Sequence, residues 1–129
     1  MTEFRDASTI VYVEDLNAML EFYRDLLGFT ETYRFPDEGP PVFVALSAGV
    51  SLALVTDGQL GSHGLEVRPR AGRQFELCVY TGDVDRAIGE LRARDVPVLV
   101  EPADQPWGER MAYVADPEGN PVMVCAPTG

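Results

Sequence analysis

One pattern occurs twice in this sequence of 129 residues, and the repetition restricts the fold more than any other feature. The first copy opens a helical pattern at Val13-Glu14-Asp15-Leu16 and closes it at Leu27-Gly28-Phe29. The second copy opens at Gly82-Asp83-Val84-Asp85 and closes near Asp95-Val96-Pro97. The aspartates that begin the two helices are 68 positions apart, about half the chain. Such a duplication predicts two similar units with a binding site between them.

Each copy carries the signals of one helix and four strands. Asp15 is a favourable N-cap, apolar residues then recur at helical spacing, and Gly28 can close the helix in a left-handed conformation. Residues rich in β-branched and aromatic types predict strands at 8–13, 29–35, 42–46 and 50–55 in the first copy. In the second copy a helix starts at Asp83, and the strands are expected at 75–80, 96–100, 110–115 and 121–126. A tight turn is predicted at Asp116-Pro117-Glu118-Gly119-Asn120.

These elements predict an α+β protein of one domain, built from two tandem βαβββ modules. The first module covers residues 1–56 and the second 74–129, and a Gly-rich polar linker joins them at 57–73. A helix covers one face of each small mixed sheet, so the other face must be buried elsewhere. Pairing the modules, within a chain or across a homodimer with or without exchanged strands, would curl the free faces into a ligand trough.

Composition excludes several functions. With 21 acidic and 10 basic residues the net charge is −11, which repels phosphate backbones and argues against nucleic-acid binding. No run approaches the roughly 18 apolar residues of a membrane helix. The charged N-terminus has no apolar run typical of a secretory signal, so we expect a cytoplasmic location. Cys78 and Cys125 lie in apolar strand-like runs and are expected to be two buried thiols that pack as small hydrophobes.

Two groups of residues resemble one known superfamily. The first is the helix opening at Val13-Glu14-Asp15-Leu16 together with Phe22–Phe29, and the second is Trp107-Gly108-Glu109-Arg110 followed by the turn at 116–120. They are similar to the vicinal oxygen chelate superfamily, which contains glyoxalases, bleomycin resistance proteins and extradiol dioxygenases. The resemblance spans nearly the whole chain. It implies the fold but leaves the function open, because this superfamily holds both metalloenzymes and metal-free binding proteins.

The resemblance also implies where metal ligands would lie. In the superfamily's enzymes they come from the first and last strand of each module, and the corresponding positions here are Ser8, Ala53, Glu76 and Met123. A catalytic divalent metal needs about three His or carboxylate ligands. Only Glu76 is of that type, because an alcohol is a weak ligand, a methyl group is none, and a thioether suits soft metals. We therefore expect no metal and no other cofactor.

Strand alternation predicts which side chains face the trough. The four ligand positions line up with Ile10, Tyr12, Cys78 and Tyr80 on the trough side. Glu76 shares its side of the strand with Cys78 and Tyr80, and Met123 shares its side with Cys125. Tyr33, Phe35 and Phe43 could supply an opposite wall, although core packing is the preferred interpretation of each taken alone. By resemblance to the drug-sequestering members, Trp107 would stack on a planar ligand, and partly buried packing is an equal alternative.

Two further side chains have competing interpretations. Glu76 is either the counter-charge of a cationic ligand group or a carboxylate hydrogen-bonded to neighbouring hydroxyls such as Tyr80. His63 is the only histidine, and an exposed position in the linker is preferred over a metal or catalytic role. With one histidine and no nucleophile beside a base, no catalytic residues are assigned.

The sequence thus predicts a metal-free protein, more a binder than an enzyme, that sequesters a planar or aromatic small molecule. Antibiotic resistance by drug binding is its most concrete version. The alternative is a glyoxalase-like lyase or isomerase, or a dioxygenase, with an atypical metal site that includes Glu76. A third interpretation is a scaffold or regulatory module without a ligand.

Overall fold

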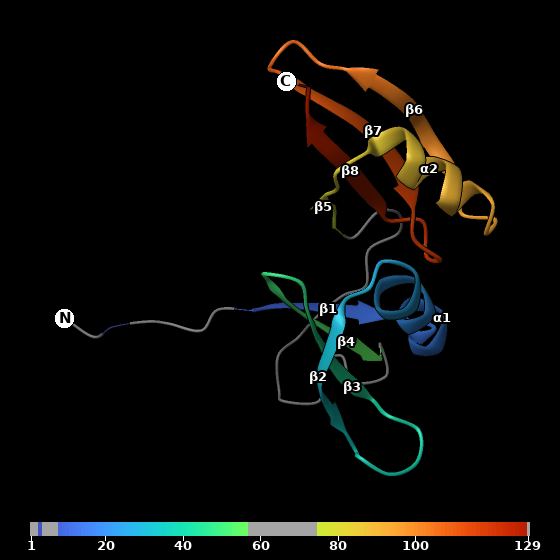
Figure 1. The fold of residues 1–129 in the computed structure, drawn as a ribbon. Helices are drawn as coiled ribbons and strands as arrows, with labels where there is room; N and C mark the ends of the chain where they lie inside the picture. Colours follow the sequence, from blue (N-terminus) through green and yellow to red (C-terminus); the bar gives the residue numbers. More distant parts are fainter. Residues whose placement is uncertain (1–2, 4–7, 57–74, 129) are drawn as a thin grey trace. The chain divides into compact units, whose positions relative to one another are not determined.

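The computed structural model describes residue 3, residues 8–56 and residues 75–128. The chain divides into two compact units, Met1–Arg68 and Pro69–Gly129, and each is described by itself (Figure 1). The predicted linker at 57–73 and His63 lie outside the described residues. Among the described residues, no helix has the length and apolar character needed to span a bilayer.

The first unit, here called module one, contains a mixed four-stranded sheet. Its elements are β1 (Thr9–Val13), α1 (Leu16–Leu20), η1 (Glu21–Leu26), β2 (Thr30–Phe35), β3 (Phe43–Ser47) and β4 (Ser51–Thr56). The strand order is β1-β4-β3-β2, in which β1 runs parallel to β4 and the other neighbours are antiparallel. The first and last strands of the module are therefore neighbours.

The second unit, module two, repeats this topology. Its elements are β5 (Leu77–Tyr80), α2 (Val84–Arg92), β6 (Val98–Asp104), β7 (Glu109–Ala115) and β8 (Pro121–Pro127). The order β5-β8-β7-β6, with β5 parallel to β8, matches module one strand for strand. The predicted α+β class with two βαβββ modules is confirmed, and each sheet stays open.

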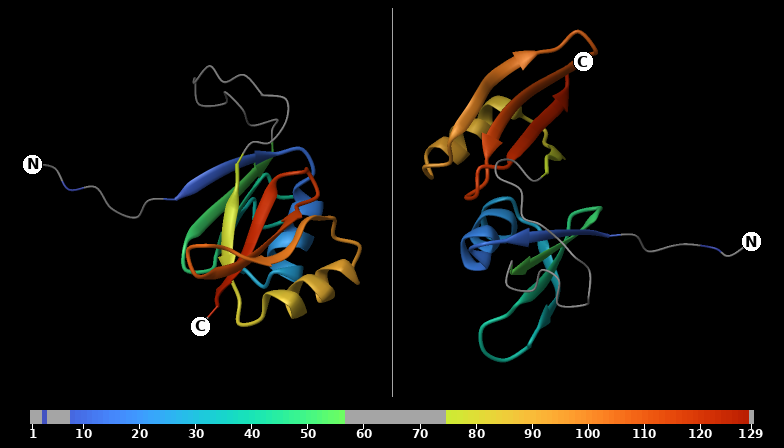
Figure 2. Two further views of the ribbon diagram at one scale, coloured as in Figure 1. Left: turned by 90° about the horizontal axis from the view of Figure 1, so that it is seen from above. Right: turned by 180° about the vertical axis from the view of Figure 1, so that it is seen from behind.

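Each helix covers one face of its own sheet, as Figures 1 and 2 show. In module one, Met19 and Tyr23 of the helix and Leu46 and Leu54 of the sheet are fully buried. In module two the core includes Ile88, Val114 and Val122. Burying such aliphatic and aromatic side chains stabilises the fold by about 1.5–3 kcal/mol each. The uncovered face of each sheet is called its open face below.

The aspartates recognised in the sequence do begin the helices. The Asp15 carboxylate accepts a hydrogen bond from the Ala18 amide at 3.0 Å, and Asp83 accepts one from the Arg86 amide at 3.1 Å. Such caps satisfy amides that have no partner inside the helix. Gly28 has a φ of +82°, as expected for the residue that ends the first helix.

The first helix differs from the second in its last turns. From Glu21 to Leu26 it is a π-helix, and the Leu27 amide donates to the Phe22 carbonyl at 2.9 Å. This wider turn places Phe22 and Tyr23, both buried, in edge-to-face contact with ring centroids 4.9 Å apart. The widened turn thus lets two successive aromatic rings enter the core.

The turn predicted at 116–120 is also confirmed. The Asp116 carboxylate accepts hydrogen bonds from the amides of Glu118 and Asn120, both at 2.9 Å, and from the Asn120 side chain at 2.9 Å. Gly119 adopts a φ of +85°, which a glycine accepts without strain. Asp116 and Asn120 are both buried, and the hydrogen bonds of the Asp116 carboxylate close the turn that joins β7 to β8 in register.

Candidate ligand-binding faces

The strand registers show that the four expected metal-ligand positions correspond in pairs between the two modules. Ile10 of β1 lies opposite Ala53 of β4, and Cys78 of β5 lies opposite Met123 of β8. Ala53 and Met123 are therefore matching positions of the two modules. Ser8 and Glu76 precede Ile10 and Cys78 by two residues, so both belong to the same open faces.

These residues do not fit a divalent metal centre. Ser8 and Glu76 are exposed, Ala53 is buried, and Met123 is half-buried. An alcohol, a methyl group, a carboxylate and a thioether provide one good ligand for a hard or borderline ion, whereas such ions take three or more. Within residues 8–56 and 75–128, no three His, Cys, Asp or Glu side chains are grouped to hold a metal ion.

The open face of module one is rich in aromatic side chains. Tyr12 is 38% exposed, Tyr33 56% and Phe35 57%, while Phe43 is half-buried. The Tyr33 and Phe43 rings meet edge to face with centroids 5.9 Å apart. The preferred interpretation of Tyr33 and Phe35 as core residues is wrong for their own module, because strand alternation turns them away from the helix. Exposed aromatic side chains gathered on one sheet face are typical of a binding surface.

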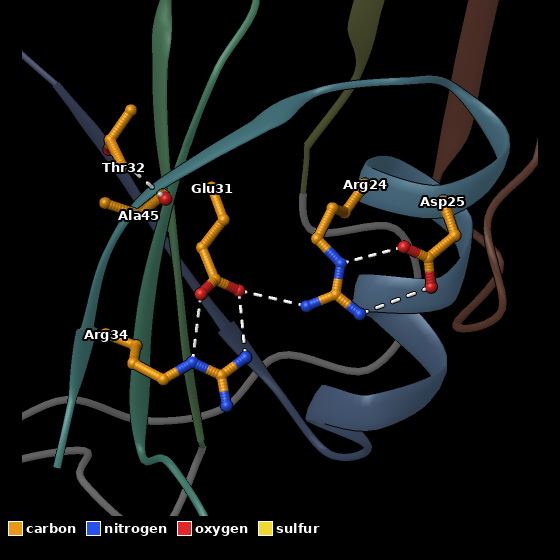
Figure 3. A network of polar contacts seen from close by, with 6 residues as sticks. All are labelled: Arg24, Asp25, Glu31, Thr32, Arg34 and Ala45. Atoms are coloured by element: carbon orange, nitrogen blue, oxygen red, sulfur yellow. Dashed lines mark hydrogen bonds and ion pairs between the residues drawn. The ribbon is translucent and has the colours of Figure 1, made fainter. Parts of the chain in front are cut away.

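A polar network lies on the helix side of the same strands (Figure 3). Glu31 of β2 accepts hydrogen bonds from the Arg24 guanidinium at 2.9 Å and from Arg34 at 2.9 and 3.0 Å. Arg24 also donates to Asp25 at 2.8 Å. The Arg34 guanidinium, followed by Arg24, holds the pKa of the Glu31 carboxyl below its usual 4.5. The network ties the end of the first helix to β2.

A bulge in β2 fixes which of its residues reach the open face. The pairing with β3 shifts between Glu31 and Tyr33, and the Thr32 hydroxyl donates to the Ala45 carbonyl at 3.3 Å (Figure 3). Because the shift absorbs one residue, Glu31 lies on the helix side while Tyr33 and Phe35 point to the open face. The bulge therefore separates the ionic network from the aromatic surface.

On module two, one carboxylate connects two of the predicted ligand contacts. Glu109 accepts a hydrogen bond from the Trp107 indole nitrogen at 3.0 Å and another from the Tyr80 hydroxyl at 2.8 Å. Trp107 is 63% exposed and Tyr80 66%. The hydrogen bond to Glu109 and its charge raise the pKa of the Tyr80 phenol to about 12. The three side chains, here called the Trp107–Glu109–Tyr80 group, present two oriented rings beside one negative charge.

The backbone explains the position of the indole. Trp107 lies in the turn between β6 and β7, where the Gly108 amide donates to the Gln105 carbonyl at 3.2 Å. Gly108 has a φ of +92°, a conformation that a side chain would disfavour. The turn leaves Trp107 outside the core, so partial burial by packing, the alternative interpretation, does not describe its position.

Glu76 has a different partner from the one expected. The Tyr80 hydroxyl donates to Glu109, whereas the tyrosine beside Glu76 is Tyr113 of β7. Burial raises the pKa of the Tyr113 phenol, and the nearby Glu76 carboxylate adds to the shift. From the sequence alone, neither Glu109 nor Tyr113 was predicted to belong to the site. Their alternation on β7 places them on one face, but only the register across β8 brings Glu109 to Tyr80.

The two cysteines lie close together on the same open face. The Sγ atoms of Cys78 and Cys125 are 3.5 Å apart, and both thiols are free. Cys125 is buried, as expected, and burial raises the pKa of its thiol to about 11. Cys78 is exposed, so the expectation of two buried thiols is wrong for this residue. Its strand has one face uncovered, although its sequence is apolar.

Fold and faces together define a βαβββ protein with open aromatic sheet faces. The sequence pattern of the Glyoxalase/Bleomycin resistance protein/Dioxygenase superfamily matches residues 7–124. The chain belongs to this superfamily, which confirms the resemblance stated above. No curated protein sequence matches it significantly.

Solved structures of the same fold cover almost all of the chain. A glyoxalase/bleomycin resistance protein/dioxygenase from Nocardioides is 30% identical, with a TM-score of 0.71 over 98% of this chain and 86% of that one. A lactoylglutathione lyase from Agrobacterium tumefaciens is 25% identical, with a TM-score of 0.72 over 96% and 94%. TioX from Micromonospora sp. ML1 is 19% identical, has a TM-score of 0.77 over 95% and 99%, and shows the fold alone.

Proposed function

We propose that this protein binds a planar or aromatic small molecule on its open sheet faces without a metal ion and without transforming it. The observation that carries the proposal is the chemistry of Ser8, Ala53, Glu76 and Met123, which offers a divalent metal one good ligand. Without such an ion, the superfamily's fold keeps its binding surface but has no Lewis acid to polarise a substrate oxygen.

The exposed aromatic side chains support binding rather than catalysis. Trp107 and Tyr80 stand exposed in fixed orientations beside Glu109, so a flat ligand loses little entropy when it stacks on them. A cationic ligand group would gain from the Glu109 charge and from the net charge of −11. Apolar burial and stacking of this kind support micromolar or tighter dissociation constants.

Bleomycin resistance proteins are one of the groups that name the superfamily, and drug sequestration is the biological role that we propose. We also propose a homodimer and a cytoplasmic location, as expected from the sequence. The trough between paired modules and any exchange of strands remain predictions.

The direct test uses Trp107, the only tryptophan of the chain. Titration with a series of planar aromatic antibiotics should change its fluorescence for at least one compound. For that compound, Trp107→Ala should weaken binding about tenfold, or by about 1.4 kcal/mol, as measured by calorimetry, because the stacking surface is lost.

Trp107→Phe is the matched control, since it keeps a flat ring at the same place and should retain most of the affinity. Unchanged Trp107 fluorescence across the whole series would contradict the proposal. Equal affinity of wild type and Trp107→Ala for a compound that does bind would place the ligand elsewhere.

A second candidate is a metal-dependent lyase, isomerase or dioxygenase. Two observations favour it: Glu76 stays at a ligand position, and the chain is 25% identical to a lactoylglutathione lyase. Elemental analysis of protein purified without chelators separates the two functions. A stoichiometric divalent metal that is lost in Glu76→Ala would support the enzyme.

A further inference from the structure

Four sulfur-containing side chains lie on the open face of module two. Cys78 belongs to β5, Met123 and Cys125 to β8, and Met111 to β7. In the ladders Cys78 lies opposite Met123, and Cys125 lies opposite Met111. The 3.5 Å contact between the two Sγ atoms fixes Cys78 and Cys125 on the same face, and strand alternation puts both methionines there as well. Small-molecule stacking on Trp107 assigns no role to the two thiols or to Met111.

The four sulfur-containing side chains differ in their exposure to solvent. Cys125 is 1% exposed, Met111 and Met123 are half-buried, and Cys78 is exposed. A small ion could therefore reach the pair through Cys78 and then be surrounded by sulfur on the inner side. Thiolates and thioethers are soft ligands that prefer soft cations over the hard ions that oxygen ligands hold.

We propose that this cluster binds one soft, monovalent metal ion of the Cu(I) class, with the thiolates of Cys78 and Cys125 as its principal ligands. The thioethers of Met123 and Met111 flank them. Each bound thiol releases its proton to solvent and no electron is transferred. At a metal–sulfur distance of about 2.3 Å, the value for zinc thiolates, two thiolates on one ion are about 3.8–4.6 Å apart, so the sulfurs need to separate by only about 1 Å.

The ligand set distinguishes this ion from zinc. A structural zinc site takes four ligands from Cys and His, and the full sequence has only two cysteines and one histidine. The remaining sulfurs here are thioethers, which suit Cu(I) better than zinc. The site shares Met123 with the positions discussed above, but its principal ligands are two thiols that are not among those positions.

The test is an anaerobic titration of the reduced full-length protein with Cu(I) in competition with a coloured Cu(I) chelator. Wild type should retain one equivalent of Cu(I) per chain. Cys78→Ser should weaken the affinity by about 100-fold or more, and Met111→Leu combined with Met123→Leu by about tenfold. Because Cys78 is exposed, its replacement leaves the core untouched.

Cys125→Ala is a second variant, to be checked by thermal unfolding because its side chain is in the core. Met19→Leu, a conservative change in the core of module one, is the matched control and should bind Cu(I) like wild type. Wild type that holds no Cu(I) against the chelator, or Cys78→Ser that binds as tightly as wild type, would overturn the proposal. So would a pair that only closes to a disulfide on treatment with a peroxide. The fluorescence titration of Trp107 tests the proposed function separately, so the failure of the copper site and the failure of ligand binding are distinguishable.

Discussion

Glu109 shows how a single side chain can organise a binding surface. Its two carboxylate oxygens accept hydrogen bonds from different donors, the Trp107 indole at 3.0 Å and the Tyr80 hydroxyl at 2.8 Å. Both aromatic residues would otherwise be free to rotate at the surface, because each is more than half exposed. Glu109 thus fixes their orientation before a ligand arrives, which lowers the entropic cost of binding.

This arrangement predicts a measurable change in Tyr80. Glu109→Gln weakens the hydrogen bond that the Tyr80 hydroxyl donates and removes the negative charge that opposes ionisation of the phenol, so the pKa of Tyr80 should fall from about 12 toward its usual 10. The wild-type phenol keeps its proton as the pH rises past 10, and the variant begins to lose it there. An NMR titration of the tyrosine ring carbons, assigned with Tyr80→Phe, measures the shift.

Glu90→Gln is the control for this experiment, because Glu90 pairs with Arg86 on α2 and makes no contact with Tyr80 among the interactions of the described residues. It should leave the Tyr80 titration unchanged. A Glu109→Gln variant whose Tyr80 still titrates near 12 would mean that another group raises the pKa.

At the residue scale, the sequence predicted which sheet face a side chain lies on better than it predicted the hydrogen-bond partner of that side chain. Alternation placed Glu76, Cys78 and Tyr80 on one side, and their exposed positions agree. It could not pair Tyr80 with Glu109, because that contact crosses β8 and depends on the register of two ladders. It also misjudged the burial of Cys78, since an apolar run does not reveal whether both faces of its strand are covered.

At the scale of elements, module one depends on the link between its helix and β2. Glu31 receives hydrogen bonds from Arg24 of the helix and from Arg34 of its own strand, and about a quarter of its side chain (27%) is exposed. Partial burial and two cationic partners make this network more stabilising than an isolated surface ion pair.

The pKa of Glu31 predicts how that contribution changes with pH. Because its folded-state pKa lies below the usual 4.5, the network stabilises the folded state at neutral pH, and this stabilisation is lost as the pH falls through the folded-state pKa. Glu31→Gln should lower the free energy of unfolding by about 1 kcal/mol at pH 7. Denaturant unfolding of both proteins at several pH values should show the difference shrinking below pH 4.5.

Glu38→Gln offers a control, since Glu38 is exposed in the turn between β2 and β3. It should unfold like wild type at every pH. A difference between wild type and Glu31→Gln that stays constant into the acid range would contradict the assignment of the effect to the Glu31 charge.

The order of the helices and strands could be predicted because caps, turn residues and periodicity all agreed. The exceptions have local physical causes. The π-helical turn of η1 depends on how Phe22 and Tyr23 pack, which periodicity does not encode. The strand expected to end at residue 100 continues to Asp104 through Pro102. A proline is tolerated there because β6 is at the edge of its sheet.

At the scale of the whole molecule, the duplication seen in the sequence is also present in the structure. The helix caps Asp15 and Asp83 are equivalent, and so are Ala53 and Met123 at the centres of the last strands. The two modules nevertheless carry different chemistry, aromatic rings in module one and carboxylates, thiols and an indole in module two. The fold has been kept twice while the side chains of its open faces have diverged.

The lack of fit for a divalent ion predicts the response of the whole protein to metals. Mn²⁺ or Ni²⁺ should leave the unfolding temperature as it is in a chelator, because an ion that does not bind the folded state cannot stabilise it. Differential scanning fluorimetry measures this directly. A metal-dependent rise in unfolding temperature that disappears in Glu76→Ala but persists in Cys78→Ser would support the enzyme alternative.

The bulges also have a consequence for self-association. Each sheet has two edge strands, and in both modules the later one, β2 or β6, has an interrupted register and a proline nearby, whereas β1 and β5 pair without interruption. Irregular edge strands pair poorly with a strand from another molecule. Any intermolecular extension of these sheets, whether a productive assembly or the first step toward a fibril, should therefore begin at β1 or β5.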